Sequence, residues 1–351
     1  MRMHVMELRP GDRVTEDIFN SFGVFVLQRG AELTDEAIVK LVQHGIDYVD
    51  IELRIKDISS SPDQPDQPLS VSLLNLKPKF EGAIDVFETL FLESLANGKF
   101  SDEGIDETLK PLMNDLMAQK DVVSLLMMFN HQDEYTYNHS LQVGLLSFYI
   151  ANWMGYEKDE AYRIGKAGYL HDMGKCMIPP HILNKPGRLT DEEFEFIKKH
   201  THYGYELILN STGDETAALV ARQHHERDDG TGYPYGLFKE EIHPYARITA
   251  VADTYSAMTS KRVYQSKKEQ LTTLQELYKL SFGQLSGEAV QALIRHLIPN
   301  FIGKKVLLTT GETGHIVMTN HSDFFRPLVK TETRFADLSK EPETAIQEVF
   351  M

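Results

Sequence analysis

Five short sites along the chain carry side chains that bind transition-metal ions. They are the adjacent pairs His171-Asp172 and His224-His225 and the single residues His139, His200 and Asp253. Neighbouring sites are separated by 24 to 32 residues of the sequence. Neutral imidazoles and carboxylates are ligands that suit divalent ions such as Zn, Fe, Ni and Mn. The pattern therefore predicts a metal centre.

The number of candidate ligands indicates how many ions such a centre would hold. Seven side chains are too many for one tetrahedral ion, which takes four. They suffice for two ions about 3.5–4 Å apart, the spacing that clamps an in-line displacement at phosphorus. A hydroxide activated by the two ions would be the attacking group. The sequence thus predicts metal-assisted hydrolysis of a phosphate ester.

The surroundings of the two aspartates support this interpretation. Successive helical residues point about 100° apart, so His171 and Asp172 can both reach one cavity only near a helix end. The following Gly174 and the pair Pro179-Pro180 suit such a change of direction. Asp172 has a short side chain with two oxygens, which suits a bridge between two ions. Asp253 lies in a helical stretch of otherwise small and apolar residues. Burial of its charge there is costly unless the carboxylate is paired or coordinated.

Composition and charge narrow the class of protein. The chain has 351 residues, 42% of them hydrophobic, and a formal charge of −16, which favours a globular protein of two or three domains. The negative charge disfavours binding to nucleic-acid polymers. A single cysteine, Cys176, excludes an intramolecular disulfide and fits a reducing compartment. We see no signal-peptide core and no apolar run long enough for a membrane span, so we expect a cytoplasmic location.

The first part of the chain mixes strand and helix patterns. Residues 23–27 and 48–51 favour strands, and the residues between Leu33 and Gly45 favour a helix. We therefore expect a small α+β module over residues 1–58. Prolines among Ser, Asp and Gln then predict a linker over residues 59–78.

The remainder is mostly helical by pattern. Residues 137–153 are apolar nearly all round, which is typical of a buried helix. Thr190 and Glu193 have the spacing of a capping box, and the helix that they begin would deliver His200 near its C-terminal end. Short strand patterns follow Pro299. We expect a mainly α protein, with a helical connector over residues 79–111, an all-helical domain over 112–298 and a small β appendage over 299–351.

Several ordered segments together resemble a known family. They are Tyr135-Thr-Tyr-Asn-His139-Ser, His171-Asp-Met-Gly-Lys175, the helix with His200, the stretch from His224 to Pro234, and Ala252-Asp253 with Thr259-Ser-Lys-Arg262. Over roughly residues 112–296 the chain resembles the HD-GYP subgroup of HD-domain phosphohydrolases. The resemblance implies an all-helical, metal-dependent phosphodiesterase. Its substrate would be a cyclic dinucleotide, chiefly cyclic di-GMP, cleaved to linear pGpG and, in some members, to GMP.

The resemblance also implies roles for single residues. The implied metal ligands are His139, His171, Asp172, His200, His224, His225 and Asp253. Asp172 and Lys175 would be catalytic, and Lys175 and Arg262 would hold substrate phosphate, which an ammonium or a guanidinium can do. The alternative to these phosphate-binding roles is a solvated charge at Lys175 and an ion pair with a nearby acid at Arg262. The loop Gly232-Tyr233-Pro234 would govern substrate access or contact diguanylate cyclase domains.

The chain departs from the family pattern at several positions. Tyr135 stands where some members place a glutamate and hold three ions, so we expect two divalent ions, Fe or Mn first, with Zn, Ni and Co also compatible. Ser256 stands where an acid is common, and Asp228 where an aromatic or apolar residue is common. Gln265 replaces a basic residue near Arg262. We expect the remaining acids of the histidine loop, Glu226 and Asp229, to orient imidazoles.

Three alternatives stay open at this point. The same chemistry could act on another cyclic dinucleotide, such as cyclic GMP-AMP. The domain could bind a cyclic dinucleotide without turnover and signal through its appendages. Related HD folds can also hold a redox-active iron pair, as an oxygenase does. The sequence gives no ligand signature for the N-terminal module and leaves homodimerisation open.

Overall fold

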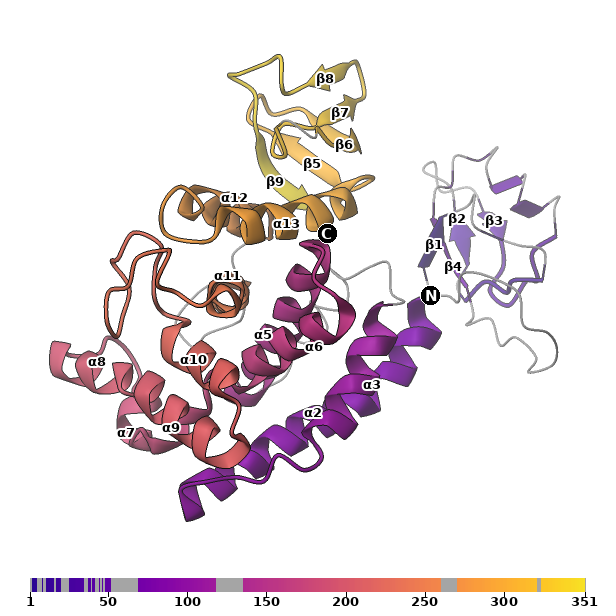
Figure 1. Cartoon of the computed structure of the whole chain (residues 1–351). Coiled ribbons are helices and arrows are strands. Elements are labelled where there is room, and N and C mark those ends of the chain that lie inside the picture. Colours follow the sequence, from indigo (N-terminus) through magenta and orange to yellow (C-terminus); the bar gives the residue numbers. More distant parts are fainter. Residues whose placement is uncertain are drawn as a thin grey trace. The chain divides into compact units, whose positions relative to one another are not determined.

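A computed structural model describes the chain over residues 2–4, 8, 11–15, 17–19, 25–34, 37–38, 40–41, 44, 46, 48–51, 69–117, 135–259, 270–320 and 323–350. These residues divide into two compact units, residues 1–66 and 67–351. Figure 1 shows the helices and strands of each unit.

The first unit holds two small antiparallel strand pairs. β1 (Arg2–His4) pairs with β4 (Tyr48–Asp50), and β2 (Ile18–Phe19) pairs with β3 (Phe25–Leu27). The described residues 37, 38, 40 and 41 are helical. Val14, Leu33 and Leu41 are buried in a core of this unit's own. The predicted α+β module is therefore confirmed.

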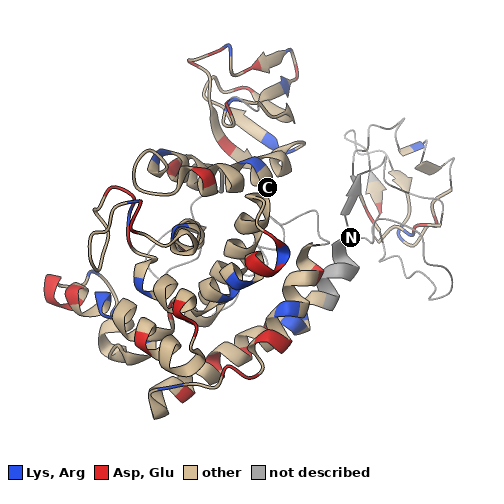
Figure 2. Cartoon of the chain, in the orientation of Figure 1, with Lys and Arg blue, Asp and Glu red and all other residues tan. Residues whose placement is uncertain are grey.

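The second unit is mainly helical. Its α-helices are α2 (Leu69–Asn97), α3 (Ile105–Met117), α5 (Tyr135–Trp153), α6 (Lys158–Leu170), α7 (Pro180–Leu183), α8 (Asp191–Lys198), α9 (His200–Thr212), α10 (Glu215–Gln223), α11 (Pro244–Thr259), α12 (Gln270–Leu280) and α13 (Gly287–Leu297), and its 3-10 helices are η3 (Met173–Met177) and η4 (Ile298–Phe301). Along α2 and α3, acidic and basic residues are interspersed (Figure 2). Within the described ranges, no helix is both long enough and apolar enough to span a membrane.

Helices α5 and α6 form the centre of this unit. Residues 138–151 of α5 are all buried, as their apolar pattern predicts. The two helices approach closely because glycines face the contact: a Cβ on Gly144 would lie 2.8 Å from Tyr169 Cβ, and one on Gly165 would lie 2.8 Å from Phe148 Cβ. This close packing fixes the end of α6 beside α5. The pair His171-Asp172 follows directly after α6.

Helix α2 packs against the same centre. It begins at Leu69, so residues 69–78 are helical and do not form the irregular linker that we expected there. Phe87 lies 5.0 Å from Tyr169 and 5.9 Å from Tyr137 between ring centroids, and the Tyr169 hydroxyl donates to Ala83 O at 2.6 Å. Of the helical domain predicted over 112–298, residues 118–134 lie outside the described residues, between the end of α3 at Met117 and the start of α5 at Tyr135.

The chain ends in a five-stranded antiparallel sheet with strand order β8-β7-β6-β5-β9. Its strands are β5 (Lys305–Leu308), β6 (Thr313–Met318), β7 (Leu328–Thr331), β8 (Phe335–Asp337) and β9 (Ile346–Phe350). One face is buried with the helical core through residues such as Val306, Ile316 and Val329. The mainly α fold with a C-terminal β appendage is confirmed, and the predicted domain boundaries stay predictions.

Candidate metal centre

Asp172 lies at the middle of the cluster, with each carboxylate oxygen facing a different group of imidazoles. Oδ1 lies 3.5 Å from His200 Nε2 and 3.8 Å from His224 Nε2. Oδ2 lies 3.2 Å from His171 Nε2 and 3.7 Å from His139 Nε2. The carboxylate therefore stands between two sets of nitrogen atoms, as expected of a group that can bridge two ions.

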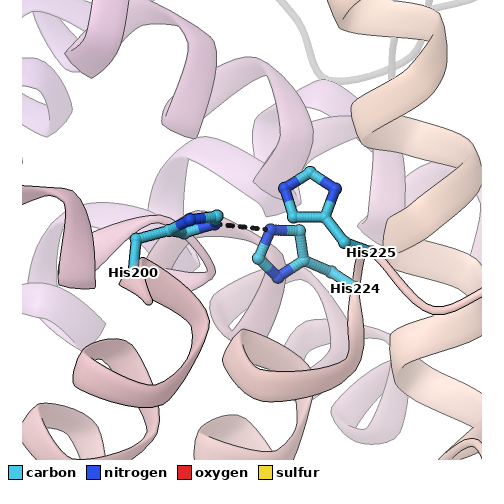
Figure 3. A group of neighbouring side chains, drawn as sticks. All are labelled: His200, His224 and His225. Carbon is cyan, nitrogen blue, oxygen red and sulfur yellow. Dashed lines mark hydrogen bonds between the residues drawn. The ribbon is translucent and has the colours of Figure 1, made fainter. Parts of the chain in front are cut away.

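Asp253 and His225 complete the two sets. Asp253 Oδ1 lies 3.0 Å from His139 Nε2, and Asp253 Oδ2 lies 3.9 Å from His225 Nδ1. His200 and His224 face each other across 3.4 Å between their Nε2 atoms, with His225 beside them (Figure 3). The structure thus brings all seven sequence-predicted side chains into one buried cluster.

Hydrogen bonds to the backbone hold three of the imidazoles. The Nδ1 atoms of His171, His200 and His224 bond the carbonyl oxygens of residues 168, 197 and 221 at 2.6, 2.7 and 2.9 Å. Because a carbonyl only accepts, each Nδ1 is protonated, and in the neutral ring each Nε2 carries the lone pair. The lone pairs therefore face the cluster, in the tautomer that a metal ligand requires.

His139 is held by side chains. Its Nδ1 lies 3.0 Å from Ser256 Oγ, which donates to Gln142 Oε1 at 2.8 Å. Ser256 was noted from the sequence only as a departure from the family pattern, and Gln142 was missed. Gln142 follows His139 by three residues on α5, so helical spacing is the signal that could have found it.

Local backbone geometry delivers the pair His171-Asp172. His171 caps the C-terminus of α6, and Asp172 has φ −101° and ψ 7°, outside the helix. The expected helix end is therefore present. Gly174 in η3 then meets the start of α9 so closely that a Cβ there would lie 2.0 Å from His200 O.

His200 is delivered differently from the prediction. The capping box is confirmed, since Thr190 Oγ1 accepts from Glu193 N at 3.2 Å and Glu193 Oε2 from Thr190 N at 2.8 Å. However, α8 ends at Lys198, and His200 is the first residue of α9. Lys199 lies between the two helices and has helical torsion angles. The helical sequence pattern therefore continues across the boundary between α8 and α9.

Burial keeps most of the imidazoles neutral. It lowers the pKa of His139, lowers the pKa of His200 to about 4, and lowers the pKa values of His224 and His225 well below their usual range. Neutral imidazole is the form that binds a metal ion.

The carboxylate charges are offset within the cluster. Burial alone would raise the pKa of Asp172, but His171 and Lys175 outweigh burial and hold that pKa well below its usual range. His139 does the same for the pKa of Asp253. Burial opposes charge on His171, yet the neighbouring Asp172 raises the pKa of this imidazole. Two ionised carboxylates thus lie among imidazole nitrogens that can act as metal ligands.

The cluster fits a metal site on its own chemistry. The cluster contains three groups of side chains, and within each group the ligand atoms lie no more than 4.8 Å apart. The groups are His200 with His224 and His225, His139 with His171 and Asp253, and His171 with Asp172 and His224. Two buried atoms, His171 Nε2 and Asp172 Oδ1, have no hydrogen-bond partner among the described residues. Orphaned acceptors at full burial are costly unless an ion binds them.

Of the two predicted phosphate-binding residues, the structure describes one. Lys175 Nζ contacts Asp172 Oδ2 at 2.5 Å, and its side chain is 20% exposed, so it reaches the edge of the cluster from η3. Arg262 and the nearby Gln265 lie outside the described residues. The phosphate-binding role of both residues stays a prediction.

The Gly232-Tyr233-Pro234 loop closes over the cluster. The Tyr233 ring stacks on His225 at 4.5 Å between centroids. The backbone of the loop passes close to Glu226 because residue 232 is a glycine: a Cβ there would lie 2.4 Å from Glu226 Cα. Lys198 Nζ lies 5.5 Å from the Tyr233 ring centroid, a cation that sequence reasoning missed because nothing in its local pattern marks it.

The acids of the histidine loop do not orient imidazoles. Glu226 is buried and accepts from Tyr235 N at 2.8 Å and Leu237 N at 3.0 Å, so it holds the loop that carries Tyr233. Asp229 accepts from the backbone and hydroxyl of Thr231. Our expectation for these two acids is wrong, because both side chains bind the loop's own backbone and side chains.

The depressed histidine pKa values predict a pH-dependent stability for metal-free protein. The pKa of His200 is about 4 in the folded chain and 6.5 when exposed, so the unfolded state binds more protons between these values. The free energy of unfolding should therefore fall as pH decreases from 6.5 to 4, by about 1.4 kcal/mol per pH unit for each such imidazole. Urea unfolding after chelation, measured across this range, tests the slope.

A histidine variant isolates one contribution to that slope. His200→Asn should lower this slope by about the share of one imidazole, and His202→Asn, at an exposed position of the same helix, is the matched control. An unchanged slope in His200→Asn would show that His200 is not a depressed titrating group.

Comparisons with known proteins agree with this site. Residues 124–281 match the HD domain family. The chain is 35% identical to a cyclic di-GMP phosphodiesterase of Thermotoga maritima, over 71% of this chain and 69% of that protein. It is 35% identical to the cyclic di-GMP phosphodiesterase PA4108 of Pseudomonas aeruginosa, over 60% of this chain but only half of that protein. Among solved structures it is similar in fold to Bd1817, an HDG"Y"P protein from Bdellovibrio bacteriovorus, with a TM-score of 0.51 and 18% identity over 84% of this chain and 97% of the other.

Proposed function

Because this chain belongs to the HD-GYP cyclic-dinucleotide phosphodiesterases of the HD-domain family, we propose that it hydrolyses cyclic di-GMP to the linear dinucleotide pGpG. We propose two divalent ions as its cofactors, Fe or Mn first. The substrate assignment is supported by the two cyclic di-GMP phosphodiesterases to which the chain is 35% identical.

One observation carries the two-ion proposal: the two oxygens of Asp172 face different imidazoles. Oδ1, with His200, His224 and His225, offers ligands for one ion. Oδ2, with His139, His171 and Asp253, offers ligands for the other. When bound, such ions supply a water of lowered pKa and positive charge beside the phosphate oxygens.

The chain's own residues do the remaining work. Asp172 and the backbone-anchored imidazoles fix the ligand atoms before substrate arrives, which avoids reorganisation during the reaction. Lys175 places an ammonium at the edge of the cluster, where it can pair with a non-bridging phosphate oxygen once substrate displaces its contact with Asp172. Tyr233 covers His225 and limits the access of bulk water on that side.

The loop after the histidine pair is also proposed as a contact for diguanylate cyclase domains. Tyr235 and Phe238 are 60% and 57% exposed, and aromatic side chains are enriched at protein interfaces. Their backbone segment is anchored by Glu226 through Tyr235 N. The rings are therefore presented on a fixed loop.

A hydrolysis assay tests the proposed substrate. Metal-stripped protein is reloaded anaerobically with Mn²⁺ or Fe²⁺ and supplied with cyclic di-GMP or 3′3′-cyclic GMP-AMP, and products are separated by chromatography. We expect pGpG from cyclic di-GMP at a kcat/KM at least tenfold above that for cyclic GMP-AMP. The reverse preference would reassign the substrate within the same chemistry. Binding of both nucleotides without turnover, at full ion occupancy, would instead indicate a binding module.

A further inference from the structure

The exposed face of the C-terminal sheet carries one row of basic and aromatic side chains across all five strands. The register places Phe335 opposite Lys330, Lys330 opposite His315, His315 opposite Lys305, and Lys305 opposite Phe350. All five are exposed, Phe335 by 63% and Phe350 by 42%. We call this set the cross-strand row.

The two lysines of the cross-strand row are available for a partner. Among the described residues neither forms an ion pair, whereas Arg334 and Lys340 of the same region pair with Glu312 and Asp337. Lys305 Nζ lies 6.0 Å from the Phe350 ring centroid, and Lys330 Nζ lies 5.9 Å from that of Phe335. Each lysine thus lies beside an exposed aromatic face, and the row itself contains no acid.

We propose that the cross-strand row binds single-stranded nucleic acid, a function beyond the hydrolysis of cyclic dinucleotides. Proteins that bind single strands combine cations that follow the phosphates with aromatic side chains on which bases stack. Here Lys305, Lys330 and His315 would contact phosphates, and Phe335 and Phe350 would stack bases at the two ends. With strands about 4.8 Å apart, the row extends for about 19 Å, a length suited to a few nucleotides.

The shape of the sheet favours a flexible partner. Adjacent strands in a sheet are rotated by about 20–25°, so four steps turn one end of the row by roughly 90° relative to the other. A single strand can follow such a turn, whereas a flat bilayer cannot contact Phe335 and Phe350 together. An acidic peptide could follow the row, but it would leave the two aromatic faces without stacking partners.

The net charge of −16 sets the expected strength of this binding. An acidic chain repels a polyanion at long range, so binding depends on the local row and is weak. Two lysine contacts to a single strand predict a slope of about −1.4 in a plot of log affinity against log salt concentration. Such a shallow slope distinguishes a short basic row from a broad basic surface.

Fluorescence anisotropy of a labelled 12-residue oligodeoxythymidylate, titrated with the full metal-loaded chain at several salt concentrations, tests the proposal. We expect Lys305→Glu/Lys330→Glu to weaken binding at least tenfold, and Phe335→Leu/Phe350→Leu to weaken it at least fivefold. Lys77→Glu, an exposed lysine of α2, should have no effect. Unfolding midpoints close to wild type would show that the sheet is intact in each variant.

Other outcomes would overturn the proposal. Binding that survives in both double variants would place the nucleic acid elsewhere on the chain. Equal competition by polyglutamate, together with full affinity in Phe335→Leu/Phe350→Leu, would indicate an acidic peptide as the partner. Co-sedimentation with phosphatidylserine vesicles but no affinity for the oligonucleotide would indicate a membrane surface.

Discussion

Asp172→Asn should reduce the turnover of the proposed substrate, cyclic di-GMP, by about 10³-fold or more. The substitution keeps the size of the side chain but removes the charge that faces both sets of imidazoles. Metal ions contribute several kcal/mol to charge stabilisation in such reactions, and each 1.4 kcal/mol is a factor of ten in rate. We also expect the number of ions retained per chain to fall from the proposed two to one or none. Elemental analysis after gel filtration, beside single-turnover hydrolysis, measures both effects.

A matched control separates this effect from a general loss of carboxylate charge. Glu206→Gln removes an acid whose only ion pair among the described residues is an exposed one with His202, so turnover and ion content should stay at the wild-type level. If Asp172→Asn kept two ions and full turnover, Asp172 would not be the shared ligand. The two-ion proposal would then fail even if the chain proved to be active.

Gly174→Ala is expected to damage the centre although it replaces none of the proposed ligands. A Cβ on Gly174 would lie 2.0 Å from His200 O and 2.4 Å from Gly204 N, so η3 and the start of α9 must separate. Overpacking of this kind typically costs about 1–3 kcal/mol of stability. A shift of about 1 Å between catalytic groups can cost about 10²-fold in rate. We expect a lower unfolding midpoint, a loss of turnover of that order and faster release of ions to a chelator.

Gly82→Ala is the control for that substitution. Gly82 lies within α2, and a Cβ there would meet nothing within 4 Å. Replacing a helical glycine by alanine at an open position stabilises a protein by roughly 0.5–1 kcal/mol, so turnover should be unchanged and the unfolding midpoint slightly higher. If Gly174→Ala behaved in the same way, the close approach of η3 to α9 would not be what positions His171 and Asp172 against His200.

The sequence predicted which residues form the cluster better than it predicted how the backbone brings them together. Histidine and aspartate side chains at ordered intervals were sufficient to name all seven cluster residues, because ligand chemistry depends on residue type. Gly174 was expected only to change the direction of the chain. Its close approach to His200 O joins segments that are 26 residues apart in the sequence. A pattern of neighbouring residues does not encode a contact between segments so far apart.

Local capping signals were reliable where they act within a single turn. The box of Thr190 and Glu193 is present because both partners lie within three residues of each other. The boundary before His200 was missed because Lys199 keeps helical torsion angles between two separate helices. Glu226 was misassigned because its partners, Tyr235 N and Leu237 N, are backbone groups, and backbone groups carry no residue signature.

Helix α2 bears on how such a domain can be inherited. Its Phe80, Phe87 and Leu90 are buried in the same core as the helices that carry the cluster, and Tyr169, two residues before His171, bonds its Ala83 O. A recombination event that copied only the residues with recognisable motifs would leave these apolar surfaces open to water. The heritable unit is therefore larger than the motif-bearing segment, and residues with no catalytic signature travel with the catalytic ones as part of one folding module.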